Sequence, residues 1–487
     1  MKYSSRLSKY QYERLSAICD DLIHCNLSSK ALVAQDFLHI SRYSPLMSKA
    51  YTVFYEKKTI NLYVRIFHIF KNIVFLIKSI CDSAFHRDLN ISGIEKKLDY
   101  LFISHYTGGQ NSQEYIDSYF GNIIKKIDTD RFKVAVAYIN HTNLKPKNLF
   151  NNKQTDLVLL SGSINFSKLI EIYKNSLLAL IKFKGIDKNI ASKRLSMKAR
   201  FDLFSPGTIK VQIIANHVKK LVTELSPRCV VTTYEGHSWE RLCFALAKEV
   251  SPSIKCIAYQ HAPIFKHQHA VKRGIGGFYD PDVILTSGKV SRDQLLSREK
   301  LKGSKILLLG SGRHMPEPSK FDKSNNNMKV CLVAPEGTIS ECETLFDFSL
   351  KCAKELKDID FIWRLPPQID IKMLQNLDID FKALEGNISI SHSSLESDIG
   401  MSNHILYRGS SVVIQAVASG LNPIYFMQDD ELPMDPLFSC YDSKRTVKSP
   451  LEFKNKMREN RVVSDLLRKY CKDMYTGLNI KVLTSIK

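Results

Sequence analysis

The sequence is poor in acidic residues. Its 487 residues contain 49 Asp and Glu against 70 Lys and Arg, which gives a formal net charge of +21. A positive surface field of this kind favours anionic partners such as nucleic acid, acidic lipid headgroups or phosphorylated substrates. Charges spread evenly for solubility would give the same total, so the imbalance indicates a class of partner and not a fold.

Paired cysteines and two common nucleotide-binding loops are also missing. None of the 11 Cys forms a C-x-x-C pair, which argues against a zinc ribbon and a thioredoxin-like motif. Cysteines scattered through apolar runs are typical of a protein in a reducing compartment. Neither G-x-x-x-x-G-K-[ST] nor G-x-G-x-x-G occurs, which disfavours an ATPase and a dinucleotide-binding enzyme.

Long uninterrupted apolar runs are absent as well. The first residues, MKYSSRLSKYQYERL, lack the apolar core and cleavage site of a secretory signal. Charged and imidazole side chains interrupt the most apolar stretch, residues 60–81, at Arg65, His68, Lys71 and Lys78. We interpret this stretch as an amphipathic helix. The protein core is the favoured partner of its apolar face, and a membrane surface is the alternative.

A chain of this length is too long for one core, and its patterns divide it into three regions. Residues 1–97 have helical periodicity and predict a basic helical extension. Residues 98–310 predict a doubly wound α/β domain, because short apolar runs alternate with helical segments. The predicted strands of this domain are Leu98–His105, Phe132–Asn140, Thr155–Ser161, Cys229–Tyr234, Ile254–Gln260 and Asp282–Ser287.

A second α/β domain is predicted over residues 328–470, after a stretch of linker composition at 311–327. Its expected strands are Lys329–Ala334, Asp360–Leu365, Ile388–Ser391, His404–Tyr407 and Pro423–Phe426. Ligands of open α/β sheets bind outside the carboxyl ends of the strands, so the strand ends are the expected site.

A helical insertion is predicted at about 166–225 within the first α/β domain. Its first part is rich in Lys and Arg. Such a basic amphipathic stretch suits an anionic bilayer or an acidic acceptor, and a solvated basic face explains it equally well.

The segment Tyr407–Phe426, YRGSSVVIQAVASGLNPIYF, is the most informative. A strand ends at Tyr407, which is a candidate contact for the base or ribose of the donor. Gly409 permits a tight turn, and Ser410 and Ser411 open an apolar helix. A helix N-terminus with free N–H groups and two hydroxyls suits a phosphate. An ordinary N-cap would explain one serine of this pattern.

This segment resembles the donor-binding strand–helix–strand of bacterial GT-B glycosyltransferases, and more narrowly the Ser-Ser motif of bacterial sialyltransferases, polysialyltransferases and capsule Kdo transferases. Those families carry an upstream His-Pro motif that contacts the nucleotide. The matching segment here is WRLPP, in which Pro367 aligns and Pro366 replaces the His. This departure removes a contact expected for a CMP-sugar, and Arg364 offers a substitute cation. The end of the first strand of the same domain, at Glu336 and Gly337, is a further donor-binding candidate because Gly lets the backbone approach a ligand.

An acidic strand end in the first α/β domain carries the predicted chemistry. Glu235 follows a strand and Gly236 allows a turn into the next helix, in the segment YEGHSWE. A carboxylate at this place can take the proton from an acceptor hydroxyl in an inverting sugar transfer. The related families have an acidic-acidic-Gly motif whose last acid is the base; Glu235 matches it, while Tyr234 replaces the first acid. Glu240 is the second candidate, and a carboxylate favoured by the helix dipole is the structural alternative.

The next strand ends in Gln260 and His261, in the segment AYQHAP. His261 is a candidate for the catalytic group or for a hydrogen bond to the donor phosphate, and a purely structural His is equally plausible. His267 and His269 lie close by, but their spacing matches no metal signature, so no metal is expected.

The segments FISHYTGGQ and DSYFG resemble bacterial surface-carbohydrate biosynthesis proteins. The residues assigned to the acceptor side of the cleft are Gly108, Gly109, Gly236, Glu240 and Gln260. Together the resemblances cover about residues 98–438. They imply an α/β, GT-B-like fold, in which two doubly wound Rossmann-like domains with an N-terminal helical extension face a cleft.

The implied activity is an inverting, metal-independent glycosyltransferase of capsule or lipopolysaccharide biosynthesis, without a cofactor. The implied partners are a nucleotide-sugar donor and a glycan or lipid-linked acceptor; an anionic membrane surface is a further candidate. The bacterial cytoplasm or the inner-membrane surface is the expected location. The alternatives are an alditol-phosphate transferase, a sugar epimerase, and a non-catalytic basic binding protein; nucleic acid is not expected as a partner.

Overall fold

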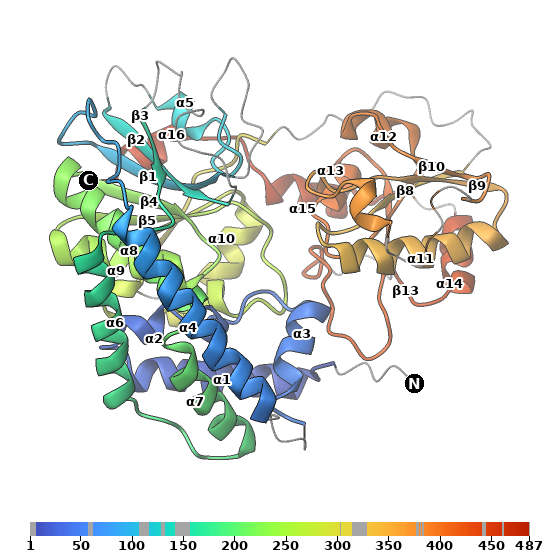
Figure 1. Ribbon diagram of the computed structural model, residues 1–487. Coiled ribbons are helices and arrows are strands. Elements are labelled where there is room, and N and C mark those ends of the chain that lie inside the picture. Colours follow the sequence, from blue (N-terminus) through green and yellow to red (C-terminus); the bar gives the residue numbers. More distant parts are fainter. Residues whose placement is uncertain are drawn as a thin grey trace.

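A computed structural model describes residues 6–56, 62–106, 116–127, 132–141, 156–301, 303–313, 329–375, 379, 381, 384–440, 445–459 and 462–486. Two separate sheets organise the described chain (Figure 1). Within these sheets every strand pairing is parallel. Parallel strands need crossover connections, which is why helices separate them along the sequence.

The first sheet has the strand order β3-β2-β1-β4-β5-β6-β7. Its strands are β1 (Tyr100–Tyr106), β2 (Val134–Asn140), β3 (Asp156–Leu160), β4 (Cys229–Thr233), β5 (Lys255–Gln260), β6 (Val283–Thr286) and β7 (Lys305–Leu308). The second sheet has the order β10-β9-β8-β11-β12-β13. Its strands are β8 (Lys329–Ala334), β9 (Ile359–Trp363), β10 (Ile388–Ile390), β11 (His404–Tyr407), β12 (Asn422–Phe426) and β13 (Thr446–Val447).

In both sheets the strand order reverses at the first strand, between β1 and β4 and between β8 and β11. This reversal is the topological switch point of a doubly wound fold, where ligands usually bind. The predicted fold class, two doubly wound α/β units of the GT-B type with a helical N-terminal extension, is confirmed. The sequence analysis missed the edge strands β7 and β13. β13 has only two residues and produces no apolar run, whereas β7 lies largely in the apolar run 306–309, which the sequence analysis did not assign as a strand.

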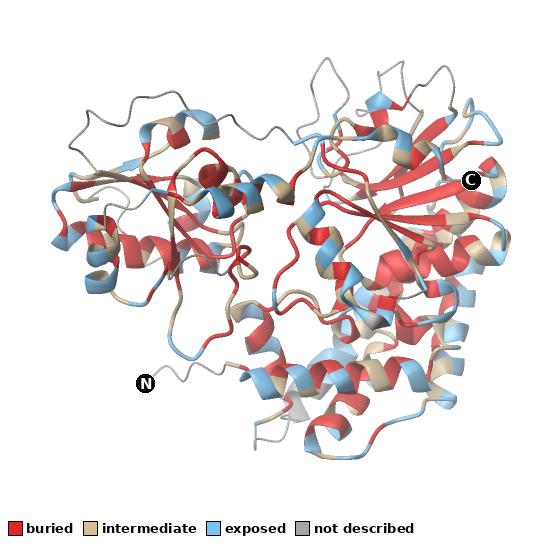
Figure 2. Ribbon diagram, turned by 180° about the vertical axis from the view of Figure 1, so that it is seen from behind, coloured by how far each residue is buried: buried red, intermediate tan, exposed pale blue. Residues whose placement is uncertain are grey.

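Each sheet is buried on both faces, and alternate residues of a strand serve opposite cores (Figure 2). In β1, Leu101 and Ile103 join one core while Tyr100 and Phe102 join the other. On the first sheet, α8 (Pro206–Leu225) and α9 (Ser238–Val250) supply one core, and α5 (Ile123–Lys126) and α16 (Ile480–Thr484) supply the other. On the second sheet, the helices are α11 (Ile339–Glu355) and α14 (Pro450–Arg458) on one face, and α12 (Leu395–Met401), α13 (Val412–Ala418) and α15 (Asp465–Met474) on the other.

The N-terminal helices and the insertion pack together beside the first sheet. The N-terminal helices are α1 (Lys9–Cys25), α2 (Lys30–Val33), α3 (Pro45–Thr52) and α4 (Leu62–Ala84), and the insertion supplies α6 (Phe166–Ile181), α7 (Ile190–Asp202) and α8. Helix α4 packs on α6, and α1 packs on α7. Among the described residues, no helix is both long and apolar enough to cross a membrane.

Helix α4 corrects one expectation. The stretch 60–81 is helical over most of its length as predicted, but of its large apolar side chains Phe75 packs against a core while most of the others face outward. Phe70 and Ile77 are 63% and 57% exposed. The side of α4 that packs on the protein is instead the one with Ser79 and Ser83, which are buried.

The chain returns to the first sheet at its end. α15 packs on both α13 and α10 (Lys289–Leu296). Beyond it, Ser311 and Gly477 form a parallel bridge, and the amide of Asn479 donates to the carbonyl of Leu309 at 2.8 Å. Leu483 then enters a core of the first sheet, so the last helix belongs spatially to the first unit.

Candidate active site

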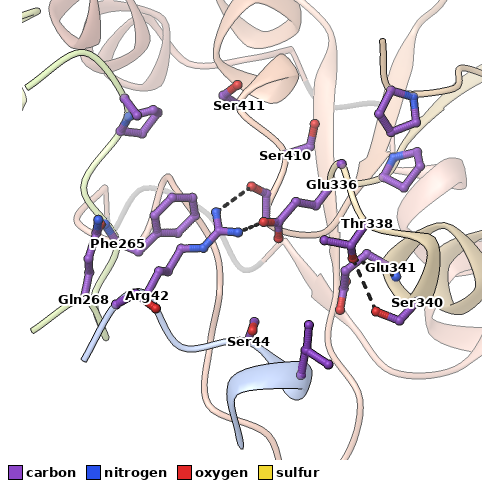
Figure 3. A pocket seen from close by; sticks show the side chains of 18 of the residues that line it. Arg42, Ser44, Phe265, Gln268, Glu336, Thr338, Ser340, Glu341, Ser410 and Ser411 are labelled. Carbon is purple, nitrogen blue, oxygen red and sulfur yellow. Dashed lines mark hydrogen bonds and ion pairs between the residues drawn. The ribbon is translucent and has the colours of Figure 1, made fainter. Parts of the chain in front are cut away.

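A cavity of about 560 Å³ lies between the two sheets (Figure 3). Three parts of the chain line it: residues 41–46 before and within the first turn of α3, residues 235–268 after strands of the first sheet, and residues 335–412 of the second sheet. The strand ends of both sheets therefore meet at one cavity, as expected for two doubly wound units that face each other.

Helix N-termini surround this cavity. Ser44 caps α3 and Thr338 caps α11, and both residues line the cavity. His237 at the start of α9 and Ser411 at the start of α13 line it too. A helix N-terminus carries unpaired N–H groups and the positive end of the dipole. The N–H groups before α9 already bind the internal carboxylate of Glu240, so the N-termini of α3, α11 and α13 are the ones that suit an anion such as phosphate.

The loop between β11 and α13 places the predicted Gly-Ser-Ser segment against the cavity. Gly409, Ser410 and Ser411 all line it, and Gly409 has φ +60, in the region that favours glycine. The Ser411 side chain makes no cap hydrogen bond to its own helix. The structure therefore brings together the three residues that the sequence assigned to the donor phosphate.

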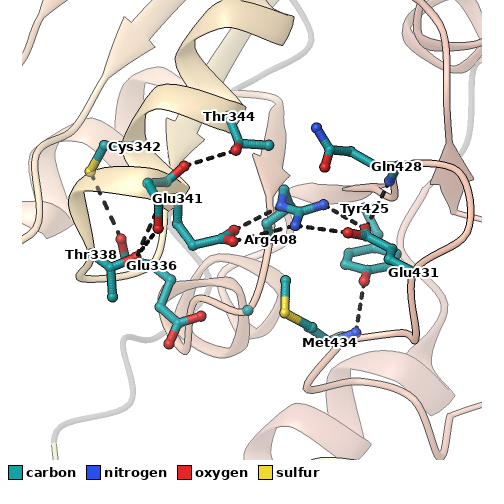
Figure 4. Close-up of polar contacts among 12 residues, drawn as sticks. Glu336, Thr338, Glu341, Cys342, Thr344, Arg408, Tyr425, Gln428, Glu431 and Met434 are labelled. Atoms are coloured by element: carbon teal, nitrogen blue, oxygen red, sulfur yellow. Dashed lines mark hydrogen bonds and ion pairs between the residues drawn. The ribbon is translucent and has the colours of Figure 1, made fainter. Parts of the chain in front are cut away.

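The two residues before this loop are turned inward. Tyr407 is fully buried and its hydroxyl donates to Asp435 at 2.8 Å. Arg408 is also fully buried and donates to Glu341 at 2.8 Å and to Glu431 at 2.6 Å (Figure 4). These contacts hold the start of the loop between β11 and α13 from its protein side, away from the cavity. The expectation that Tyr407 touches the base or ribose is contradicted, because its ring lies in the core behind the cavity wall.

The residues that follow β9 differ in where their side chains lie: some line the cavity, and one points into the protein. Pro366 and Pro367 line the cavity, as does Gln368. Arg364 does not: its guanidinium donates to the buried Asp398 at 2.6 Å and to the carbonyl of Ser393. The prediction that Arg364 replaces the missing His is therefore wrong in this structure, because an internal carboxylate holds it away from the cavity.

Arg42 supplies the cation that the sequence analysis assigned to Arg364. Its guanidinium forms an ion pair with Glu336, donates to the carbonyl of Gly409 at 3.4 Å, and lies 4.2 Å from the centre of the Phe265 ring. Figure 3 shows it reaching from the N-terminal segment to the second sheet. Burial lowers the pKa of Arg42, and the nearby carboxylate of Glu235 opposes this shift. No local motif marks Arg42; the bridge between Arg42 and Gln268 and the backbone hydrogen bond from Tyr43 to the carbonyl of His267 hold its segment here.

Glu336 and Gly337 line the cavity as predicted. One carboxylate oxygen of Glu336, Oε2, is buried and has no hydrogen-bond partner among the described residues. Glu336 thus neutralises Arg42 at the cavity wall, and a ligand anion bound there would compete with Glu336 for the guanidinium.

Glu235 lines the cavity on the first-sheet side, together with His237. The two side chains are 3.1 Å apart, between Glu235 Oε2 and His237 Nε2. Burial raises the pKa of Glu235, but the hydrogen bond and charge of His237, with His261 and Arg42, outweigh it and lower the pKa to about 2. Burial lowers the pKa of His237, but Glu235 and Glu240 outweigh it and raise the pKa to about 9. The pair is therefore charged at neutral pH, with the carboxylate free of a proton.

Glu240 has a structural role. Its buried carboxylate accepts the backbone N–H groups of Glu235, Gly236 and His237 at 2.8 to 3.2 Å. The prediction of Glu240 as an acceptor-side or basic group is contradicted, because these bonds occupy its oxygens inside the turn. Gly236 lies in the same turn with φ +82, and an added Cβ would lie 2.3 Å from the backbone of Ala270. Gly236 permits the close packing of this turn and does not line the cavity.

His261 and Gln260 lie behind the cavity wall. Both are buried, and the cavity begins at the following residues, Ala262 and Pro263. The His261 ring contacts the Tyr119 ring at 5.3 Å, and burial lowers its pKa. Nδ1 of His261 and the side-chain amide oxygen Oε1 of Gln260 have no hydrogen-bond partner among the described residues. These two residues are next to the site and do not face it in this structure.

A layer of aromatic and imidazole rings extends behind Glu235. His105 Nδ1 lies 2.8 Å from His141 Nε2, and the His105 ring contacts Trp239 edge-on. Across the described residues no group of three metal-ligating side chains occurs. The predicted acceptor-side residues Gly108 and Gly109 lie outside the described residues.

No family model matches the sequence, and no curated protein matches it. Solved structures of similar overall fold include the glycosyltransferase of kitacinnamycin, with 10% identity, a TM-score of 0.45, and coverage of 78% of this chain and 95% of that chain. They also include UDP-GlcNAc 2-epimerase from Neisseria meningitidis, bound to UDP-GlcNAc, with 12% identity, a TM-score of 0.43, and coverage of 79% and 98%. MurG from Acinetobacter baumannii gives 10% identity, a TM-score of 0.43, and coverage of 80% and 99%. Likeness at this level describes a type of fold and says nothing of the reaction.

Proposed function

We propose that the protein is a glycosyltransferase that moves a sugar from a nucleotide-activated donor to a glycan or lipid-linked acceptor. The observation that carries the proposal is the cavity between the two sheets. Helix N-termini, Arg42 and the Gly-Ser-Ser loop make one wall suited to phosphate, and Glu235 supplies a carboxylate on the other. A sugar transfer needs these two functions on opposite sides of the anomeric carbon.

In the proposed reaction the donor phosphate binds at Ser410 and Ser411 and at the start of α11. It competes with Glu336 for Arg42, because phosphate, like carboxylate, pairs bidentately with a guanidinium. The helix N-termini and Arg42 then stabilise the charge that develops on the leaving nucleotide, as preorganised dipoles do without a metal.

Glu235 takes the proton from the acceptor hydroxyl while the acceptor oxygen attacks the anomeric carbon, which inverts the configuration there. A carboxylate with a pKa near 2 is ionised but weakly basic. An anionic donor beside Arg42 offsets part of the positive charge that lowers this pKa, so donor binding raises the basicity of Glu235.

The proposal extends to a bacterial surface polysaccharide, such as capsule or lipopolysaccharide, as the product, and to the cytoplasmic face of the membrane as the location. A CMP-sugar is the first donor to test, because the Gly-Ser-Ser loop lines the cavity. An epimerase acting on a nucleotide-sugar is the second candidate that the same cavity would suit; it would change the donor without any acceptor.

The test is thermal unfolding with CMP, CDP, UDP, GDP and their common sugars. A nucleotide that binds the folded protein raises the unfolding midpoint by mass action. The variant Ser410→Ala/Ser411→Ala loses hydrogen bonds to a charged group, so we expect affinity to fall about 10- to 100-fold. The control Ser251→Ala/Ser253→Ala removes an exposed hydroxyl pair in the turn that follows α9. Absence of a shift with every nucleotide, or an equal shift in both double variants, would contradict the proposal.

A further inference from the structure

Helix α4 presents its apolar side to the outside of the molecule. The exposed large apolar residues recur at helical spacing and form one stripe: Ile66, Phe67, Ile69, Phe70, Ile73, Val74, Ile77 and Ile80. Side chains three and four positions apart lie on one face of a helix. The opposite side, which packs on the protein, carries the buried Ser79 and Ser83, the half-buried Asn72, and Phe75, which packs against a core supplied by α6 and α8. Most large apolar side chains of α4 thus face outward, whereas an ordinary surface helix turns them towards the core.

The stripe continues into an apolar groove between α4, α6 and α7. The groove has a volume of about 650 Å³, and its walls include Ile73 of α4, Leu180 of α6 and Phe201 of α7. Ile181, next to the groove at the end of α6, is 72% exposed. A contiguous apolar surface of this extent on a folded protein marks a place of contact with another apolar phase or partner.

Basic side chains border the stripe. Lys71 and Lys78 are exposed on α4 and, at 100° per residue, fall at one edge of the apolar stripe. Further exposed basic residues follow on and after α6, at Lys174, Lys182 and Lys184. The acidic side chains nearby are Asp82, Glu171 and Asp187; Lys168 pairs with Glu171 and Lys193 with Asp187. The border of the apolar stripe is therefore positive overall.

We propose that the outward face of α4 binds the surface of an anionic lipid bilayer. The apolar stripe enters the boundary between headgroups and acyl chains, and Lys71 and Lys78 contact anionic headgroups. Because the other side of α4 packs on α6, the helix lies in the plane of the membrane. A second copy of the chain fits less well, since it would bring the same positive border and a like net charge of +21 to the contact.

This inference deepens the membrane location included in the proposed function, by naming the surface that makes the contact. The cavity between the sheets and the apolar stripe have no residue in common. Bilayer binding and nucleotide binding can therefore fail independently, and each has its own measurement.

The experiment is vesicle flotation of the full chain. We compare vesicles of phosphatidylcholine alone with vesicles of equal parts phosphatidylcholine and phosphatidylglycerol. The variant Phe70→Ser/Ile73→Ser/Ile77→Ser removes three exposed apolar side chains, and we expect its affinity for the mixed vesicles to fall roughly 100-fold or more. Lys71→Gln/Lys78→Gln should lower binding about tenfold or more on the mixed vesicles and leave binding to neutral vesicles unchanged.

The control is Leu451→Ser/Val462→Ser/Leu466→Ser, which removes three equally exposed apolar side chains from the second unit. It should bind the mixed vesicles like the unaltered protein. The inference is overturned if the α4 variant floats as the control does, or if light scattering shows a dimer that the α4 variant dissociates. A thermal shift with the donor nucleotide, retained in the α4 variant, shows that the variant is folded.

Discussion

Two strand ends that flank the cavity share a sequence pattern and differ in what they offer a ligand. After β4 the chain reads Tyr-Glu-Gly-His, and from the end of β11 it reads Tyr-Arg-Gly-Ser. In both, the tyrosine is buried and the glycine has a positive φ, +82 at Gly236 and +60 at Gly409. Yet Glu235 lines the cavity, while Arg408 is fully buried.

The difference lies in the partners behind each turn. Behind β11, Glu341 and Glu431 bind both sides of the Arg408 guanidinium and keep it inside. Behind β4, the internal carboxylate of Glu240 binds backbone N–H groups, so Glu235 remains available to the cavity. One kind of turn thus gives a carboxylate on one wall and the proposed anion-binding loop on the other. Arg408 is held inside by two carboxylates, whereas Glu235 pairs with His237 at the cavity and still lines it.

The largest expected effect is a loss of catalytic rate on substitution of Glu235, the charged turn residue that lines the cavity. Glu235→Gln removes the proposed base and should lower the rate of sugar transfer about 10²- to 10⁴-fold, because general base catalysis contributes on this scale. The thermal shift with the donor nucleotide should remain. Turnover with the identified donor is the measurement. Glu336→Gln, a carboxylate on the other wall, is the control; an equal loss in both variants would refute the assignment of the base.

Substitution of Arg408, the buried charged residue of the second turn, should lower the stability of the folded protein. Arg408→Met leaves Glu341 and Glu431 buried without their cation, and we expect the free energy of unfolding to fall by about 3–5 kcal/mol. Urea unfolding followed by circular dichroism measures it. Lys351→Met breaks an exposed pair with Asp347 on α11, and should cost about 0–1 kcal/mol. Similar losses in the two variants would show that the second-sheet turn needs no internal support.

The two glycines should respond unequally. In Gly236→Ala the new Cβ meets the backbone of Ala270 at 2.3 Å, whereas in Gly409→Ala it meets the flexible carboxylate end of Glu336 at 2.5 Å. In both variants the positive φ should lower the free energy of unfolding by about 1–2 kcal/mol. Gly236→Ala should lower it by at least a further ~1 kcal/mol, because the backbone of Ala270 cannot move aside as a flexible side chain can. Thermal midpoints of the two variants decide this. A greater loss in Gly409→Ala would contradict it.

The smallest effect is the pH dependence of the Glu235–His237 pair. Glu235 has a pKa lowered from 4.5 to about 2. Its contribution to the stability of the folded protein is therefore complete above pH 4.5 and is lost as pH falls through about 2. His237 has a pKa raised from 6.5 to about 9, so its contribution is complete below pH 6.5 and is lost as pH rises through about 9.

The stabilisation by this pair should thus be largest between about pH 4.5 and 6.5. The thermal midpoints of the protein and of His237→Gln should differ most in that range and converge towards about pH 9.5. Because about a third of each side chain is exposed, solvent screens the pair and the difference is small. A difference that grows with pH would reverse the assigned charges.

The sequence predicts the strands and the positions of the strand ends well, because continuous apolar runs mark buried parallel strands. It predicts poorly which residue of a strand end faces the ligand. Tyr407 and Arg364 point away from the cavity because Asp435 and Asp398 hold them, and both partners lie on other elements.

Contacts between segments far apart in the sequence explain why the sequence analysis missed Arg42 and assigned the wrong surroundings to the apolar face of α4. Arg42 reaches the site only through the packing of the N-terminal segment on residues 265–268. For α4 the periodicity predicts an amphipathic helix, but not which of its sides the protein covers. Such choices depend on tertiary packing, which a local pattern does not contain.

The return of the last helix to the first sheet sets an order of events during synthesis. The strands of the first sheet leave the ribosome early, and domains generally begin to fold as they emerge. One core of that sheet nevertheless requires Leu483 and its neighbours, which follow the whole second sheet along the chain. A nascent chain therefore carries an unfinished apolar surface on its first unit until the second unit has also been made.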